Sequence, residues 1–71
     1  MNYNINENKI YKKIIDAKTA SEIMGISRST VYKMVERKKI DYIEYPDSIR
    51  FYESDILNYI ENHKIRAVND F

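Results

Sequence analysis

The chain has 71 residues, a length that suits one small domain, and it contains no Cys, which excludes disulfides and thiolate metal sites. Its formal net charge is only +1 at pH 7, so the overall charge alone does not indicate a nucleic-acid partner. No apolar run approaches the roughly 20 residues that span a bilayer, and the Asn-rich start lacks the apolar segment of a signal peptide, so we expect a cytoplasmic protein without a membrane partner.

The first residues of the chain are polar, with Asn at positions 2, 4, 6 and 8. Such a segment cannot bury enough apolar surface to become ordered, so we expect residues 1–9 to form a flexible arm. Four apolar residues then begin the expected core: Ile10, Tyr11, Ile14 and Ile15. The sequence leaves open whether they form a short strand or a lead-in turn.

A first helix is predicted from Ala17 to Met24. Asp16 is a favoured N-cap residue, and Gly25 suits the left-handed conformation in which many helices end. Three residues at helical spacing are expected to face inward, namely Ala20, Ile23 and Met24. Three others are expected to face solvent, namely Lys18, Ser21 and Glu22. The small side chain of Ala20 allows another helix to approach closely.

A second helix is predicted to begin after Ser27, a further N-cap residue, and to run to about Arg37. Its inward-facing residues are expected to be Ile26, Val31, Met34 and Val35. Two helices joined by so short a turn must cross. This is the helix-turn-helix arrangement, in which the second helix enters the DNA major groove.

The charge is distributed unevenly along the chain. Residues 28–39 contain five Lys or Arg residues and one Glu, a net charge of +4, whereas residues 40–61 contain one Arg and six acidic residues, a net charge of −5. A basic second helix is the electrostatic footprint that DNA binding requires. The alternative is that these charges are only solvated.

Residues on the outer face of the second helix are candidates for DNA contact. Arg28 is the first choice for a base contact, because Arg can donate two hydrogen bonds to guanine. Ser29 and Thr30 suit bases or phosphates, although Thr30 could instead support the helix cap. Tyr32 could donate to a phosphate or simply pack. The remaining cations are expected to bind phosphates without reading sequence: Lys33, Arg37, Lys38 and Lys39.

The pattern after Lys39 alternates as in a β-hairpin. Strands are predicted at Asp41–Tyr45 and Ile49–Tyr52, with a turn at Pro46-Asp47-Ser48. A hairpin that follows a helix-turn-helix is a wing, so the fold class is expected to be mainly α with a β-hairpin wing, a winged helix-turn-helix.

A last helix is predicted to begin at Glu53 or Ser54 and to fray near Lys64. Its buried face is expected to consist of Ile56, Leu57, Tyr59 and Ile60. We therefore expect residues 10–64 to form the DNA-binding domain and residues 65–71 to form a tail.

No nucleophile, base and orienting group can be assembled by spacing, so we expect no enzyme and no catalytic residues. The one Gly excludes a Gly-rich phosphate loop, and we expect no cofactor. His63, the only His, is expected to act as a cation at a helix end rather than as a metal ligand.

The chain resembles the excisionase and MerR-like family of small winged helix-turn-helix DNA-binding domains over roughly residues 14–63. The resemblance is carried by Ala20, by the segment from Gly25 to Tyr32, and by Arg50-Phe51 followed by Ser54-Asp55-Ile56. It implies that the second helix reads the major groove and that the wing touches adjacent DNA. It also implies a role as an excisionase (a recombination directionality factor) or a small transcriptional regulator, often on a mobile genetic element.

The wing tip departs from the family pattern. Family members commonly carry Gly and basic residues there, whereas this chain has Pro46-Asp47-Ser48, and Asp47 would repel a phosphate. A wing contact is therefore expected to come from Arg50. The full expected DNA-binding set is Ser27, Arg28, Ser29, Thr30, Tyr32, Lys33, Arg37, Lys38, Lys39 and Arg50.

Double-stranded DNA is the expected partner, and an integrase is a further candidate. The alternative function is a protein-interaction module in which the acidic hairpin and the tail dock onto a recombinase or repressor. The sequence has no long heptad region after the wing, so we expect a monomer that binds DNA cooperatively, or a weak homodimer.

Overall fold

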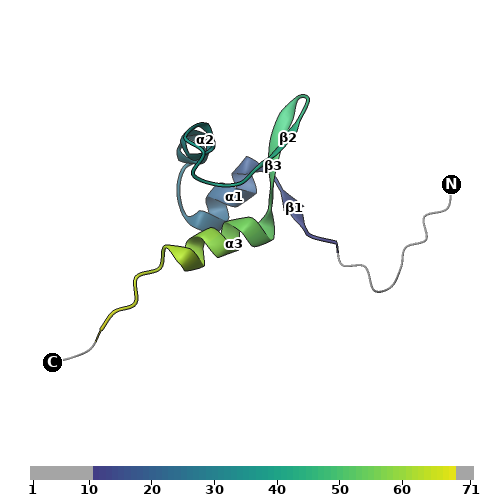
Figure 1. The fold of residues 1–71 in the computed structure, drawn as a ribbon. Coiled ribbons are helices and arrows are strands. Elements are labelled where there is room, and N and C mark those ends of the chain that lie inside the picture. Colours follow the sequence, from purple (N-terminus) through teal and green to yellow (C-terminus); the bar gives the residue numbers. More distant parts are fainter. Residues whose placement is uncertain (1–10, 69–71) are drawn as a thin grey trace.

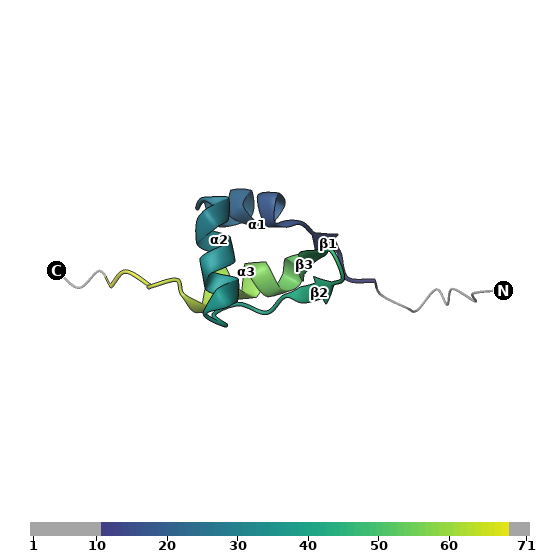
Figure 2. The same cartoon turned by 90° about the horizontal axis from the view of Figure 1, so that it is seen from above.

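The computed structural model describes residues 11–68, where three helices pack around a small antiparallel sheet (Figures 1 and 2). The elements in chain order are β1 (Ile14–Ile15), α1 (Ala17–Met24), α2 (Arg28–Glu36), β2 (Ile43–Tyr45), β3 (Ser48–Tyr52) and α3 (Glu53–Asn62). The predicted fold class, mainly α with a β-hairpin wing, is confirmed. The expected arm at residues 1–9 lies outside the described residues. Within the described range, no helix is long and apolar enough to cross a membrane.

Both predicted N-caps of the helix-turn-helix are present. The Asp16 carboxylate accepts a hydrogen bond from the Thr19 backbone N–H at 2.8 Å, and the Ser27 hydroxyl oxygen accepts one from the Thr30 backbone N–H at 3.1 Å. Gly25 ends α1 in the left-handed conformation, with φ of 73°, and its N–H donates to the Ser21 carbonyl. A β-carbon is disfavoured at this φ, which is why Gly is suited to the turn.

Helices α1 and α2 cross at close range, as Figure 2 shows. Ala20 on α1 and Val31 on α2 are both fully buried, so the small side chain of Ala20 lies in the core between packed elements. The largest fully buried side chains are Phe51, Ile56 and Val31, from β3, α3 and α2. One core therefore joins the helix-turn-helix to the sheet and the last helix.

The prediction that Ser21 faces solvent is wrong, because its side chain is buried. Helix α1 contacts both α2 and α3, so its buried face is wider than the apolar residues alone indicate. The Ser21 hydroxyl donates to the Lys18 carbonyl at 2.7 Å. This bond satisfies the hydroxyl within its own helix, so a small polar side chain is accepted in the interior.

The sheet has the strand order β1-β3-β2, and both pairs are antiparallel. Ile14 pairs with Tyr52 and Ile15 with Phe51, so the segment whose form the sequence left open is a strand. Side chains alternate across a strand, and only Ile15 points into the core. The expectation that Tyr11 and Ile14 begin the core is therefore wrong, since both are exposed, and Ile10 lies outside the described residues.

The hairpin is tighter and its first strand shorter than predicted. Tyr45 pairs directly with Ser48, so only Pro46 and Asp47 form the turn. The first strand begins at Ile43, which pairs with Arg50 of β3. The residues before it are held by the buried side chain of Ile40, so the chain reaches the edge of β3 only at Ile43.

Helix α3 starts directly after β3. Tyr52 provides no side-chain cap, and the Glu53 N–H instead donates to the Lys13 carbonyl at 2.9 Å. Ile56 is fully buried, and Tyr59 and Ile60 pack against the core. The prediction that Leu57 is buried is wrong, because this side chain is 46% exposed. Positions i, i+3 and i+4 from Ile56 fill the buried stripe, and Leu57 lies beside it.

Candidate nucleic-acid interface

Helix α2 and the tip of the β2–β3 hairpin project to the same side of the molecule, and α3 lies on the opposite side (Figure 1). Helix α2 is held there by its inner face, where Val31 is fully buried and Met34 and Val35 pack against the core. The same packing leaves the remaining side chains of the helix on the outside. A helix and a wing presented together in this way form one surface that can meet a DNA duplex.

The predicted site residues of α2 itself are all exposed: Arg28, Ser29, Thr30, Tyr32 and Lys33. Arg37, at the C-cap, is exposed as well. This face offers guanidinium, ammonium and hydroxyl groups, which are the groups that donate to phosphates and to base edges.

Three hydroxyls are joined at the N-terminus of α2. The Ser27 oxygen lies 3.1 Å from the Ser29 hydroxyl oxygen and 2.9 Å from that of Thr30. All three side chains are exposed, yet they are held in place by one another and by the cap. Free backbone N–H groups at a helix N-terminus favour an anion, so this end suits a phosphate or a polar base edge.

The backbone has an unusual conformation just after α2, where two further basic residues lie. Lys38 has a positive φ of 56°, and the Lys39 N–H donates back to the Met34 carbonyl at 2.8 Å. The Lys38 ammonium donates to the Tyr42 hydroxyl at 3.2 Å and lies 5.4 Å from the centre of that ring. Lys38 is therefore held near the connection to the wing, and both Lys38 and Lys39 are exposed.

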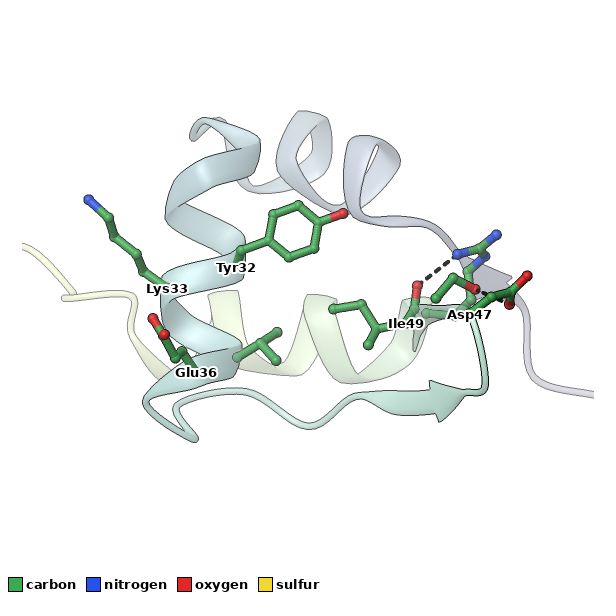
Figure 3. A pocket seen from close by; sticks show the side chains of 8 residues that line it. Tyr32, Lys33, Glu36, Asp47 and Ile49 are labelled. Atoms are coloured by element: carbon green, nitrogen blue, oxygen red, sulfur yellow. Dashed lines mark hydrogen bonds between the residues drawn. The ribbon is translucent and has the colours of Figure 1, made fainter.

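An open groove of about 620 Å³ separates α2 from the wing (Figure 3). Its lining residues are Tyr32, Lys33, Val35 and Glu36 from α2, and Asp47, Ser48, Ile49 and Arg50 from the hairpin. In Figure 3 the ring of Tyr32 is turned toward the hairpin side, whereas the ammonium of Lys33 points away from it. The groove thus brings three predicted site residues together, namely Tyr32, Lys33 and Arg50.

Arg50 is turned back onto its own strand rather than presented at the wing tip. Its guanidinium donates to the Ile49 carbonyl at 2.8 Å, and the side chain is only partly exposed. The tip itself carries Asp47, which is exposed and accepts from the Ser48 hydroxyl at 3.4 Å. A carboxylate is therefore the charged group that the wing tip presents.

Arg50 also lies close enough to the start of α1 to act on Asp16. The hydrogen bond from the Thr19 backbone N–H lowers the pKa of the Asp16 carboxyl most, the Thr19 side chain lowers it further, and the positive charge of Arg50 adds a smaller lowering.

Sequence reasoning missed several residues of the groove, above all Glu36. It follows Lys33 by three positions and Ser29 by seven, a spacing that places all three on one helical face and could have identified it. Ile49 and Val35 were assigned to a strand and to the core, and their position in the groove depends on how the hairpin packs. No group of three or more His, Cys, Asp or Glu side chains in residues 11–68 is arranged to hold a metal ion.

The two capped helices, their crossing and the adjoining wing define a winged helix-turn-helix module. Residues 14–64 match a family model described as a helix-turn-helix domain, and the chain belongs to this family, which includes excisionase-like small helix-turn-helix domains. Membership implies that the protein binds double-stranded DNA. Searches of curated proteins and of solved structures gave no match.

Proposed function

We propose that this protein binds specific sequences in double-stranded DNA through α2 and acts as an excisionase or a small transcriptional regulator. One observation carries the proposal: α2, which is capped by Ser27 and has an exposed polar outer face, lies on the same side of the molecule as the tip of the wing. In a helix-turn-helix protein this is the face that enters the major groove.

The distribution of charge along the chain also supports a complex in which α2 faces the DNA. Residues 28–39, which form α2 and the turn after it, carry a net charge of +4, and residues 40–61 carry −5. A polyanion is attracted to the first segment and repelled by the second. The helix rather than the wing therefore supplies most of the attraction to DNA in this proposal.

The proposed contacts differ along α2. Arg28 reads a guanine, and the hydroxyls of Ser27, Ser29 and Thr30 contact a phosphate or a base edge beside the helix N-terminus. Tyr32, which is exposed on α2, donates its hydroxyl to a phosphate beside the helix. Four cations contact phosphates without reading sequence, namely Lys33, Arg37, Lys38 and Lys39. Arg50 makes the wing contact after giving up part of its bonding to Ile49.

The proposal includes more than one copy on DNA. A single module of this size buries about 600–1,000 Å² against DNA, which limits the specificity that one copy achieves. We propose a monomer that binds neighbouring sites cooperatively, with an integrase as a second partner if the role is excision. An excisionase of this kind would bend its site, so circularly permuted DNA fragments should differ in gel mobility when the protein is bound.

Amide chemical shifts during titration with a mixed pool of DNA duplexes test the proposal directly. We expect shifts to concentrate in residues 27–39 and around the β2–β3 turn, with α3 little changed. Shifts confined to α3 and the acidic edge of the hairpin would contradict the proposal and favour the protein-interaction function. An equal response to single strands would contradict duplex recognition.

A further inference from the structure

Glu36, the last residue of α2, is an acidic residue on a face that otherwise carries donors and cations. It follows Ser29 by seven residues, Tyr32 by four and Lys33 by three, and at 3.6 residues per turn these side chains share one stripe. Val31, on the opposite side of the helix, is fully buried. Glu36 is exposed, so its carboxylate belongs to the outermost part of α2.

The Glu36 carboxylate forms no ion pair with another residue of 11–68, so an internal salt bridge does not account for an acidic residue at this position. The two ion pairs of residues 11–68 join Lys13 to Glu53 and Lys18 to Glu22. Neither involves Glu36, although Lys33 and Arg37 are its neighbours on the same helix. The position therefore contributes a negative charge to the surface that meets DNA, without a salt bridge that would offset this charge.

The side of the groove beside Glu36 disfavours a phosphate, since Arg50, the wing cation that lines the groove, donates to the Ile49 carbonyl of its own strand. Asp47 lines the groove from the wing, so carboxylates stand on both of its sides, and Val35 and Ile49 provide an apolar lining between them. Lys33 is the α2 cation of this groove, and its ammonium points away from the hairpin (Figure 3). A DNA group that meets Glu36 favourably must be a hydrogen-bond donor.

In the major groove such donors are the exocyclic amino groups of bases. Cytosine presents its N4 amino group, whereas guanine presents two acceptors and thymine presents an acceptor and a methyl group. Adenine places an acceptor next to its amino group, which repels a carboxylate. We propose that Glu36 is a specificity-determining residue that accepts a hydrogen bond from the N4 amino group of a cytosine. This inference rests on the proposed function, because it requires α2 in the major groove.

Glu36 and Arg28 would read different base pairs. Eight positions separate them, or about 12 Å along the axis at 1.5 Å per residue. Arg28 suits guanine and Glu36 suits cytosine, so α2 would specify one base of each kind at separate positions of the site.

Selection of binding sites from randomised duplexes tests this inference with the wild type, Glu36→Gln and the matched control Glu61→Gln, which removes an exposed carboxylate from α3 outside the groove. We expect the wild type and Glu61→Gln to select the same site, with cytosine at one position. Glu36→Gln should change that position alone, toward adenine, because Gln pairs with the N6 and N7 atoms of adenine. Its affinity for the wild-type site should fall by about 5- to 150-fold.

Two results would overturn the inference in distinguishable ways. If Glu36→Gln selects the wild-type site and binds all duplexes more tightly, Glu36 only repels DNA, and the proposed function stands without this residue's role. If the wild type binds no duplex at low salt, the proposed function and the inference fail together.

Discussion

Lys38 holds a backbone conformation that costs a non-glycine residue about 1–2 kcal/mol, since its φ is 56°. We expect Lys38→Gly to raise the free energy of unfolding by about 1 kcal/mol, because Gly adopts this conformation without a steric penalty. The matched control is Lys39→Gly, which removes the same charge one residue later, where φ is not positive. Chemical denaturation of both variants measures the difference, and equal stabilities would show that the strain at Lys38 is negligible.

The contact between Lys38 and Tyr42 gives a reason for a Lys at this strained position. The ring and hydroxyl of Tyr42 hold the ammonium beside the connection to the wing. If Lys38 binds a phosphate as proposed, Lys38→Gly should be more stable than the wild type and bind DNA more weakly. Backbone strain at a functional position lowers stability, and proteins retain it where the residue serves function.

Asp16 makes stability depend on pH in the acid range. Its pKa is lowered in the folded state, mainly by the hydrogen bond from the Thr19 backbone N–H. The folded protein therefore holds the proton less tightly than the unfolded chain, so the cap stabilises the fold above about pH 4 and is lost as the pH falls through the lowered pKa.

Thermal melts of the wild type and of Asp16→Asn between pH 2 and pH 7 measure this effect. Asn retains a capping oxygen but does not titrate, so the melting temperature of this variant should fall less on acidification. Identical pH profiles for the two proteins would show that the cap does not contribute to acid sensitivity.

At the scale of elements, the crossing of α1 and α2 depends on a small residue. Ala20 is fully buried between packed helices. Ala20→Leu should lower the free energy of unfolding by about 1–3 kcal/mol through overpacking. Glu22→Leu, at an exposed position of the same helix, is the control and should change stability little. Equal melting temperatures for wild type and Ala20→Leu would contradict the close crossing.

The hairpin provides a test of whether the wing lies near DNA. Asp47 is exposed at its tip, where a carboxylate repels the phosphate backbone. Asp47→Lys should therefore tighten binding to duplex DNA at low salt, and the gain should shrink as salt rises. Glu61→Lys makes the same change of charge on α3 and should have a smaller effect. No gain for Asp47→Lys would place the wing away from the backbone.

Elements governed by local chemistry were predictable from the sequence. Asp16, Gly25 and Ser27 fix the ends of α1 and α2 through bonds to residues a few positions away, and these bonds are present in the structure. Ser21 and Leu57 were assigned to the wrong environments, because their burial depends on which faces of α1 and α3 meet other elements. The positive φ of Lys38 was not predictable, since a Gly is expected at such a helix end.

At the scale of the whole molecule, the candidate site was predictable in part. The outer residues of α2 follow from helical spacing and are exposed as expected. The groove was not predictable, because it forms only where residues 47–50 of the hairpin come to lie opposite residues 32–36 of α2. Glu36 illustrates the difference: its place on the helical face follows from spacing, but the carboxylate opposite it on the wing is a consequence of tertiary structure.

In the proposed complex, the uneven charge favours an approach of α2 to DNA. Residues 28–39 carry +4 and attract a polyanion, whereas the acidic residues of the hairpin and α3 repel it. Because each phosphate contact releases a counterion, the salt dependence of binding reports how many cations of residues 28–39 are used.

The central claim is that α2 lies on DNA, and its most direct test is fluorescence anisotropy of a duplex pool titrated with protein at several salt concentrations. The proteins are the wild type, Lys33→Ala with Arg37→Ala, and the control Lys64→Ala with Arg66→Ala, which removes one Lys and one Arg from the exposed segment after α3. We predict binding that weakens with salt, and a plot of log affinity against log salt that is shallower by about one to two units in the α2 variant only, at roughly 0.9 per phosphate. Absence of duplex binding at low salt, or equal slopes for the two double variants, would contradict the claim.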